Sequence, residues 1–126
     1  MAQMGAPDMK LPIQYALLYP ERRRMTGERL DFWSLKALDF EKPDLENFPG
    51  LSLAYEAGRA GGTLPTVFNA ANEWAVAAFL QGRIGYLDIT DIIGEGMARH
   101  KNIEAPGLEE ILRTEAETYH YIKDRW

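Results

Sequence analysis

The stretch from Gly61 to Gly82 constrains the fold more than any other part of this chain. Two glycines open it, one glycine closes it, and the residues between them form the most apolar and most helix-like run of the sequence. A helix that is apolar on nearly all sides is buried by its neighbours. We therefore predict that residues 63–81 form the central helix of a small bundle, capped at its start by Thr63, and that its C-terminal end has almost no solvent face.

Three polar side chains interrupt the first half of this predicted helix. Asn69, Asn72 and Glu73 are spaced i, i+3 and i+4, so they lie on one face. A carboxylate with two amides could orient a substrate hydroxyl, or the three groups could hydrogen-bond neighbouring segments and fix the register of the bundle. Because acid–base catalysis needs a second titratable partner at a suitable spacing, and the sequence offers none, we favour the structural interpretation.

The composition excludes several classes of protein. The chain has 126 residues, which predicts one domain with at most a short appendage. Its formal net charge is -5 and its longest block of like charge is Arg22–Arg24, so a nucleic-acid-binding protein is not expected. It has no cysteine, which excludes disulfides, thiolate nucleophiles and cysteine zinc sites. No apolar run is long enough to predict a membrane span.

Apolar periodicity predicts three more helices after residue 50, joined by short connections that make sequential helices antiparallel neighbours. One precedes the central helix and ends at Gly61–Gly62. The next begins at a cap, Asp88 or Thr90, and ends near His100. The buried stripes of the last two helices are predicted to be Ile89, Ile92, Ile93 and Met97, and Leu108, Ile111, Leu112, Tyr119 and Ile122.

The chain before residue 50 has a different character. Residues 10–19 predict a short helix that Pro20 stops. Residues 20–49 lack a sustained helical period and predict an extended linker. Its aromatic side chains, Phe32 and Trp33 among them, are expected to pack on a neighbouring surface rather than to stack on a ligand.

One pair of residues has the spacing of metal ligands on a helix. Glu117 and His120 form a Glu-x-x-His pair, as in di-iron bundle proteins. Such a site needs two of these pairs and two further glutamates, and the sequence has only this pair. We therefore expect no metal site in this chain.

Several collinear motifs resemble one family. The segment Gly5-Ala6-Pro7-Asp8-Met9-Lys10-Leu11-Pro12-Ile13 is similar to a motif of 1-deoxy-D-xylulose 5-phosphate reductoisomerase. Further matches follow in the order of that family, and they cover most of the chain. They are Tyr19-Pro20-Glu21-Arg22, Leu30-Asp31-Phe32, Phe40-Glu41-Lys42-Pro43-Asp44, Phe48-Pro49, Asn69-Ala70-Ala71-Asn72-Glu73, Ala77-Ala78-Phe79-Leu80 and Leu87-Asp88-Ile89.

The resemblance implies the C-terminal region of a longer enzyme. The fold is then mainly α: a C-terminal four-helix bundle (46–126), preceded by an extended linker (19–45) and a short strand and helix remnant at the edge of the catalytic domain (1–18). Full members reduce and isomerise 1-deoxy-D-xylulose 5-phosphate to 2-C-methyl-D-erythritol 4-phosphate in isoprenoid biosynthesis. They use NADPH and Mg²⁺ or Mn²⁺, whose sites lie upstream, so this chain is expected to bind neither cofactor and to be inactive alone.

The resemblance also implies roles for a few residues. Pro7 and Met9 match a loop that lines the substrate and nicotinamide pocket, and Asp8 between them is expected to shape that loop as a hydrogen-bond acceptor. No catalytic residue and no metal ligand is expected in the chain. The expected partners are the rest of the reductoisomerase and, in the full enzyme, a second copy. A bacterial cytoplasmic location is favoured over a plastid.

A second interpretation belongs to a different functional class. The chain could be a free-standing helical protein-interaction module that has kept the family sequence but serves another partner. An open reading frame that extends upstream of Met1 into a catalytic domain would support the first interpretation, and a start codon with its own ribosome-binding site at Met1 would support the second.

Overall fold

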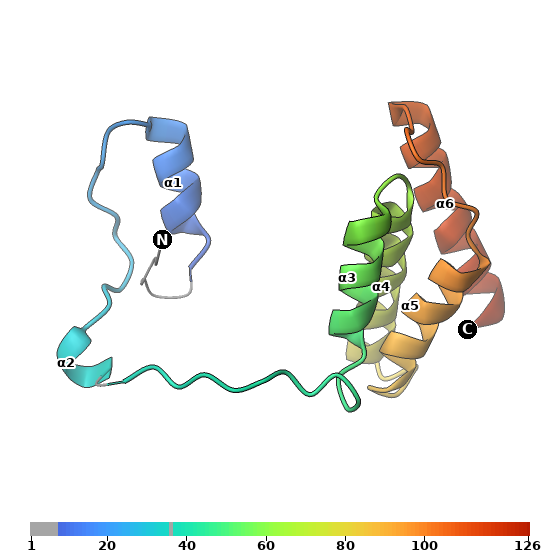
Figure 1. The fold of residues 1–126 in the computed structure, drawn as a ribbon, viewed down its shortest axis with the longest axis horizontal. Helices are drawn as coiled ribbons and strands as arrows, with labels where there is room; N and C mark the ends of the chain where they lie inside the picture. The colour runs from blue at the N-terminus through green and yellow to red at the C-terminus, as the bar shows by residue number, and fades with distance from the viewer. Residues whose placement is uncertain (1–7, 36) are drawn as a thin grey trace. The chain divides into compact units, whose positions relative to one another are not determined.

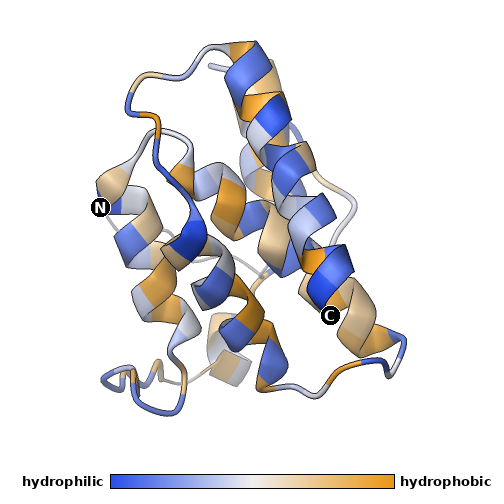
Figure 2. Cartoon of the chain, turned by 90° about the vertical axis from the view of Figure 1, so that its right-hand side faces the viewer, coloured by the Kyte–Doolittle hydropathy of each residue, from blue (hydrophilic) through white to orange (hydrophobic). Residues whose placement is uncertain are grey.

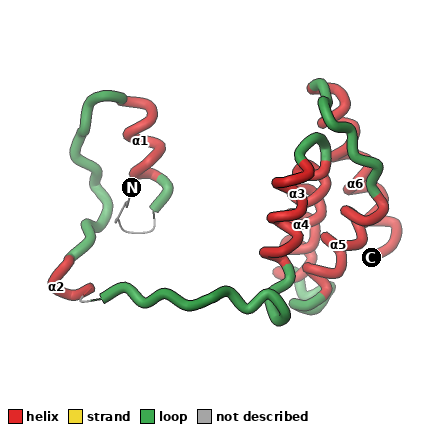
Figure 3. Tube along the Cα trace, in the orientation of Figure 1, coloured by secondary structure: helices red, strands yellow, loops and turns green. Residues whose placement is uncertain are grey.

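The computed structural model describes residues 8–35 and 37–126, and every regular element in this part of the chain is a helix (Figure 3). The prediction of a mainly helical fold is confirmed. The predicted strand remnant lies in residues 1–7, outside the described residues. The helices are α1 (Lys10–Leu18), α2 (Phe32–Leu35), α3 (Gly50–Ala60), α4 (Leu64–Leu80), α5 (Asp88–Arg99) and α6 (Leu108–Arg125).

The chain divides into two units, one up to Lys42 and one from Pro43 to Trp126. In the second unit, α3, α4, α5 and α6 lie side by side and alternate in direction (Figure 1). Helix α4 contacts each of the other three, so its predicted central place is confirmed. The core of this bundle consists of Ala57, Leu64, Val67, Ala71, Ala75, Ile92, Ile93, Met97 and Ile122.

Small residues allow α4 and α5 to approach each other closely. Gly96 on α5 is buried, and a Cβ atom placed on it would lie 3.6 Å from Cγ1 of Val67 and 3.7 Å from Cβ of Ala71. Glycine lowers the helical stability of α5 by about 1 kcal/mol relative to alanine. The close packing against α4 offsets that loss through dispersion contacts.

The expectation that the C-terminal end of α4 has almost no solvent face is wrong. Val76, Phe79 and Leu80 are 36%, 37% and 77% exposed. The three neighbouring helices cover the side of α4 that carries its small residues, such as Ala71, Ala75 and Ala78. The side that carries Val76 and Leu80 has no neighbour in the described bundle.

The predicted stripe of α6 is also partly wrong. Leu108 and Leu112 are 71% and 54% exposed, whereas Thr114 and Thr118 are buried together with Ile122. Residues 114, 118 and 122 follow one another at i, i+4 and i+8, so they share a face. The hydroxyl of Thr118 donates to the backbone oxygen of Thr114 at 2.7 Å, which allows it to be buried. Figure 2 colours most of α6 as hydrophilic, with isolated hydrophobic turns.

The glycines end their helices as predicted, but the caps of α5 differ. Gly61 and Gly82 have positive φ angles of 62° and 69°, a conformation that glycine adopts without strain. Neither Asp88 nor Thr90 caps α5, because Leu87 occupies that position. The carboxylate of Asp88 accepts the N–H of Gly85, and the hydroxyl of Thr90 donates to the backbone oxygen of Leu87.

The first unit contains α1, the short helix α2 and irregular segments before, between and after them. Helix α1 ends at Leu18, one residue before the predicted end, and it has no buried residue. Phe32 and Trp33 form the short helix α2, which the sequence did not predict, and they are 60% and 91% exposed. Within the described residues the two rings are not covered, and their packing on a neighbouring surface stays a prediction. No described helix is both long and apolar enough to cross a membrane.

Candidate functional site

The loop before α1 holds the residues that were expected to face a substrate. Pro7 lies outside the described residues. Oδ1 of Asp8 accepts the N–H of Lys10 at 2.9 Å, which fixes the first turn of α1. Met9 is 71% exposed in the described chain.

The segment around Gly27 lies beside this loop. A Cβ atom placed on Gly27 would lie 3.7 Å from Oδ2 of Asp8 and 3.3 Å from Cε of Met25. Asp8, Leu11 and residues 23–25, 27–30 and 32 line a hollow of about 350 Å³. The segment around Gly27 therefore supports the loop on the side of Asp8 and leaves Met9 exposed.

The polar face of α4 is hydrogen-bonded to α6. Nδ2 of Asn69 donates to Oε1 of Glu73 at 3.3 Å, and the hydroxyl of Tyr119 donates to Oε2 of Glu73 at 2.8 Å. The structure thus brings Asn69 and Glu73 together. It leaves Asn72 half-buried, without a hydrogen bond to either residue.

The Glu73–Tyr119 pair is suited to holding helices rather than to moving protons. The hydrogen bond to Glu73 is the main cause that raises the pKa of Tyr119, with burial and the charges of Glu73 and Glu115 adding to it. Near pH 7 the phenol therefore keeps its proton. Sequence reasoning placed Tyr119 in the buried stripe and missed this bond, because no local spacing links residues 46 positions apart.

A second polar network fixes the start of α4. Thr63 is fully buried, and its hydroxyl lies 2.7 Å from Nε2 of His100 and accepts the N–H of Ile103 at 3.0 Å. Oδ1 of Asn102 accepts the N–H groups of Thr63 and Leu64 at 2.9 and 3.1 Å. Thr63 therefore occupies the predicted cap position, but the side chain that caps the helix is Asn102.

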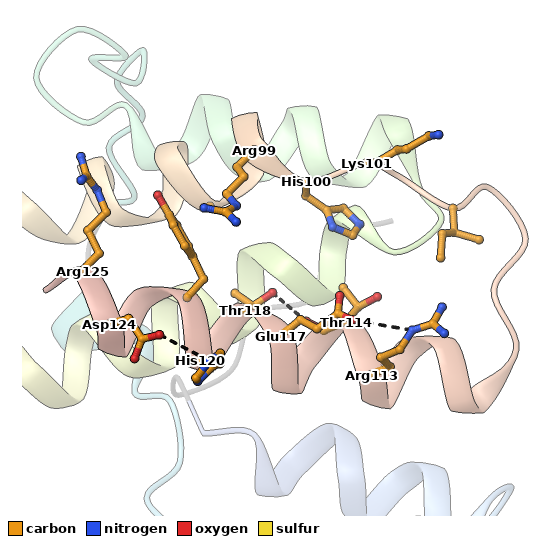
Figure 4. Close-up of a pocket in the computed structure, with 13 residues that line it drawn as sticks. Arg99, His100, Lys101, Arg113, Thr114, Glu117, Thr118, His120, Asp124 and Arg125 are labelled. Carbon is orange, nitrogen blue, oxygen red and sulfur yellow. Dashed lines mark hydrogen bonds and ion pairs between the residues drawn. The ribbon is translucent and has the colours of Figure 1, made fainter.

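His100 connects this network to a groove between α5 and α6. Burial lowers the pKa of His100, and the nearby charge of Glu117 opposes that effect. The groove encloses about 920 Å³. Figure 4 shows Arg99, His100 and Lys101 on one side of it and residues of α6, from Arg113 to Arg125, on the other.

Two pairs of charged or titratable side chains in the groove lie along α6 itself. Arg113 lies 3.8 Å from Glu117, and His120 lies 3.4 Å from Asp124 (Figure 4). Glu117 and His120 therefore contact different partners along α6, Arg113 and Asp124. In residues 8–35 and 37–126, no three His, Asp or Glu side chains gather in a way that could hold a metal ion.

Comparison with known proteins identifies the family. Residues 4–121 match the family model described as DXP reductoisomerase C-terminal domain. The chain belongs to this family. It is 56% identical over 126 residues to 1-deoxy-D-xylulose 5-phosphate reductoisomerase of Agathobacter rectalis, and the match covers 100% of this chain and 33% of that protein. The reductoisomerase of a Geobacillus strain is 53% identical over 124 residues, 98% of this chain and 32% of that protein.

Solved structures of DXP reductoisomerases share the fold. The enzyme from Zymomonas mobilis, in complex with NADPH, has a TM-score of 0.83 and 42% sequence identity, over 98% of this chain and 33% of that chain. A DXP reductoisomerase in complex with NADPH, fosmidomycin and magnesium has a TM-score of 0.81 and 37% identity, over 97% of this chain and 32% of that chain. The chain thus spans about a third of the length of the relatives that it matches.

Proposed function

We propose that this chain forms the C-terminal third of a 1-deoxy-D-xylulose 5-phosphate reductoisomerase, which makes 2-C-methyl-D-erythritol 4-phosphate for isoprenoid biosynthesis. The observation that carries the proposal is the 56% identity over the whole chain to one third of a reductoisomerase. In that enzyme the chain supports the catalytic domain, and it has no turnover alone.

Within this proposal, the parts of the chain have separate tasks. Residues 1–18 form the edge of the catalytic domain, residues 19–45 form the linker, and residues 46–126 form the helical domain. Pro7 and Met9 line the wall of the substrate and nicotinamide pocket, and Asp8 shapes the loop between them. The exposure of Met9 and the bond from Lys10 to Asp8 support these roles.

The cofactors belong to the rest of the enzyme. Relatives have been solved with NADPH and with magnesium. The described residues of this chain do not fit a metal ion, because they offer no cluster of three suitable ligands. The metal and most of the NADPH site are therefore supplied by the N-terminal two thirds of the enzyme, and the contribution of this chain is the loop at Pro7 and Met9.

The polar face of α4 has a structural task in this proposal. Asn69, Asn72 and Glu73 fix the register of the bundle, and the bond from Tyr119 to Glu73 supports this role for Glu73. The full enzyme is proposed to be a homodimer in the bacterial cytoplasm. The bacterial source of the relatives supports the location.

The experiment has two arms that share one assay. The chain alone, mixed with 1-deoxy-D-xylulose 5-phosphate, NADPH and Mg²⁺, is expected to oxidise no NADPH above background. A chimera in which this chain replaces the last third of the Agathobacter rectalis enzyme is expected to turn over at a rate within about tenfold of the parent. An inactive but folded chimera would contradict the proposal and favour a free-standing interaction module.

A further inference from the structure

The C-terminal end of α4 carries an apolar surface that the bundle does not cover. We name Val76, Phe79, Leu80 and Tyr86 the α4-end surface. Val76, Phe79 and Leu80 are spaced i, i+3 and i+4, so they share one face of the helix. The ring of Tyr86 packs edge-on against Phe79, with 5.9 Å between their centroids, and extends the surface into the loop before α5.

These apolar side chains are exposed although α4 is the helix that the other three helices of the bundle contact. The four side chains are 36%, 37%, 77% and 60% exposed in the order just given; the first three lie on the central helix of the bundle, and Tyr86 lies in the loop that follows it. Removing apolar side chains of this size from water is favourable, so a partner that covers them gains binding free energy. Contiguous apolar surface of this kind marks a binding site for another protein surface.

The same face of α4 changes character along its length. Asn69 and Glu73 lie about two turns and one turn before Val76 and are exposed, and the bond from Tyr119 joins Glu73 to α6. An apolar centre next to a polar edge with satisfied hydrogen bonds is the usual composition of a protein interface.

The lengths of the relatives indicate what covers this surface. Reductoisomerases that match the whole chain are three times as long, and this chain matches their C-terminal domain. The rest of such an enzyme is therefore the occupant that the comparisons supply for an uncovered surface of the bundle. The described bundle offers the α4-end surface on its most contacted helix, with two of its four side chains more than half exposed.

We propose that the α4-end surface is the docking site for the N-terminal two thirds of the reductoisomerase. This inference rests on the proposed function. It names Val76, Phe79, Leu80 and Tyr86 as the apolar contacts and places Asn69 and Glu73 at their polar edge.

Hydroxyl-radical footprinting tests the proposal because it labels exposed side chains and needs no turnover. Labelling of Leu80 and Tyr86 is compared between the 126-residue chain and the Agathobacter rectalis chimera. We expect it to fall about fivefold or more in the chimera, because docked side chains are withdrawn from solvent. Leu108 and Leu112, which are exposed on α6, are the matched controls, and their labelling should change by less than about twofold.

Two results would overturn the proposal. One is equal labelling of the α4-end surface in the chain and in the chimera. The other is low labelling in the chain alone at every concentration, which would show that residues 8–42 cover the surface. Low labelling only at high chain concentration would show that a second copy covers it, and would overturn the proposal equally.

A variant gives an independent measurement. Leu80→Glu in the chimera is expected to split thermal unfolding into two transitions, because the bundle no longer docks, whereas Leu112→Glu keeps one transition. In the 126-residue chain, both variants should unfold at the wild-type temperature, since both leucines are exposed there. A folded chimera without turnover would refute the proposed function, whereas loss of the labelling difference would refute the docking surface alone.

Discussion

The hydroxyl of Tyr119 on α6 donates a hydrogen bond of 2.8 Å to the carboxylate of Glu73 on α4. This bond joins two helices that are not neighbours along the chain, and α5 lies between them in the sequence. It therefore fixes how α6 is placed against the central helix, which apolar packing alone does less specifically.

Replacing Tyr119 with Phe tests that bond. The variant keeps the ring and removes the donor, so we expect a loss of about 0.5–1.5 kcal/mol in the free energy of unfolding, and the low end of that range because Glu73 is exposed. Urea unfolding followed by circular dichroism measures the change. Tyr86→Phe is the control, since the structure gives that hydroxyl no hydrogen bond. Equal stabilities of the two variants would show that the bond contributes nothing.

Capping of α4 by Asn102 gives a second prediction. Asn102→Ala leaves the N–H groups of Thr63 and Leu64 without their side-chain acceptor at a buried site. We expect a loss of about 1–3 kcal/mol in the free energy of unfolding. Asn69→Ala, at an exposed position of α4, should change it by less than about 0.5 kcal/mol. Similar values for the two alanine variants would contradict the capping role.

The lowered pKa of His100 leads to a prediction of how the free energy of unfolding depends on pH. Because burial lowers the pKa of His100 in the folded chain, the unfolded chain binds a proton more readily. Stability is therefore fully present above the unfolded pKa of 6.5 and declines as the pH falls through it toward the lower folded pKa. Chemical unfolding between pH 5 and 8 measures this slope.

The variant His100→Gln should flatten that slope, because glutamine does not titrate and can still hydrogen-bond Thr63. His120→Gln, which removes the other histidine of the chain, is the comparison variant. A wild-type slope in His100→Gln would assign the pH dependence to other groups.

Two glycines are predicted to respond in opposite directions to alanine. Gly58 lies inside α3, and a Cβ atom there meets nothing within 4 Å, so Gly58→Ala should stabilise the chain by about 0.5–1 kcal/mol. Gly62 has a φ of 62°, and a Cβ atom there would collide with the backbone oxygen of Ile103. Gly62→Ala should therefore lower the thermal unfolding temperature, whereas Gly58→Ala raises it. A shift in the same direction for both would show that backbone conformation does not decide the effect.

Amide hydrogen exchange tests the isolated state of α1. This helix buries no side chain in the chain, and Leu17 is 79% exposed, so its amides should exchange many times faster than those of α4. A short helix without packing is only marginally stable in water. Slow exchange of the α1 amides in a monomeric chain would contradict this prediction, because it would show that α1 is packed against another part of the chain.

The sequence predicted those features that follow from local chemistry. Gly61 and Gly82 adopt positive φ angles and end α3 and α4, as glycine does after many helices. The spacing of Ile92, Ile93 and Met97 defines the buried face of α5. The family was recognisable because its motifs are short, collinear and local.

Long-range choices could not be predicted from spacing. Helix α6 carries leucines on one face and threonines on another. Which of the two faces is buried depends on how α6 packs against α4 and α5. Thr114 and Thr118 are buried although leucines lie nearby, and the hydroxyl of Thr118 tolerates burial because it bonds to the backbone oxygen of Thr114. The bonds of Glu73 to Tyr119 and of Thr63 to His100 likewise join residues that are 46 and 37 positions apart in the chain.

The cap of α4 has a consequence for the order in which this region can form. The acceptor on Asn102 lies 38 residues after the N–H of Leu64 that it satisfies. On a ribosome, α4 emerges with its first turn uncapped, and it stays so until α5 has been synthesised and has returned along it. The beginning of the central helix is therefore among the last parts of the α4–α5 pair to become stable, although it is the first to be made.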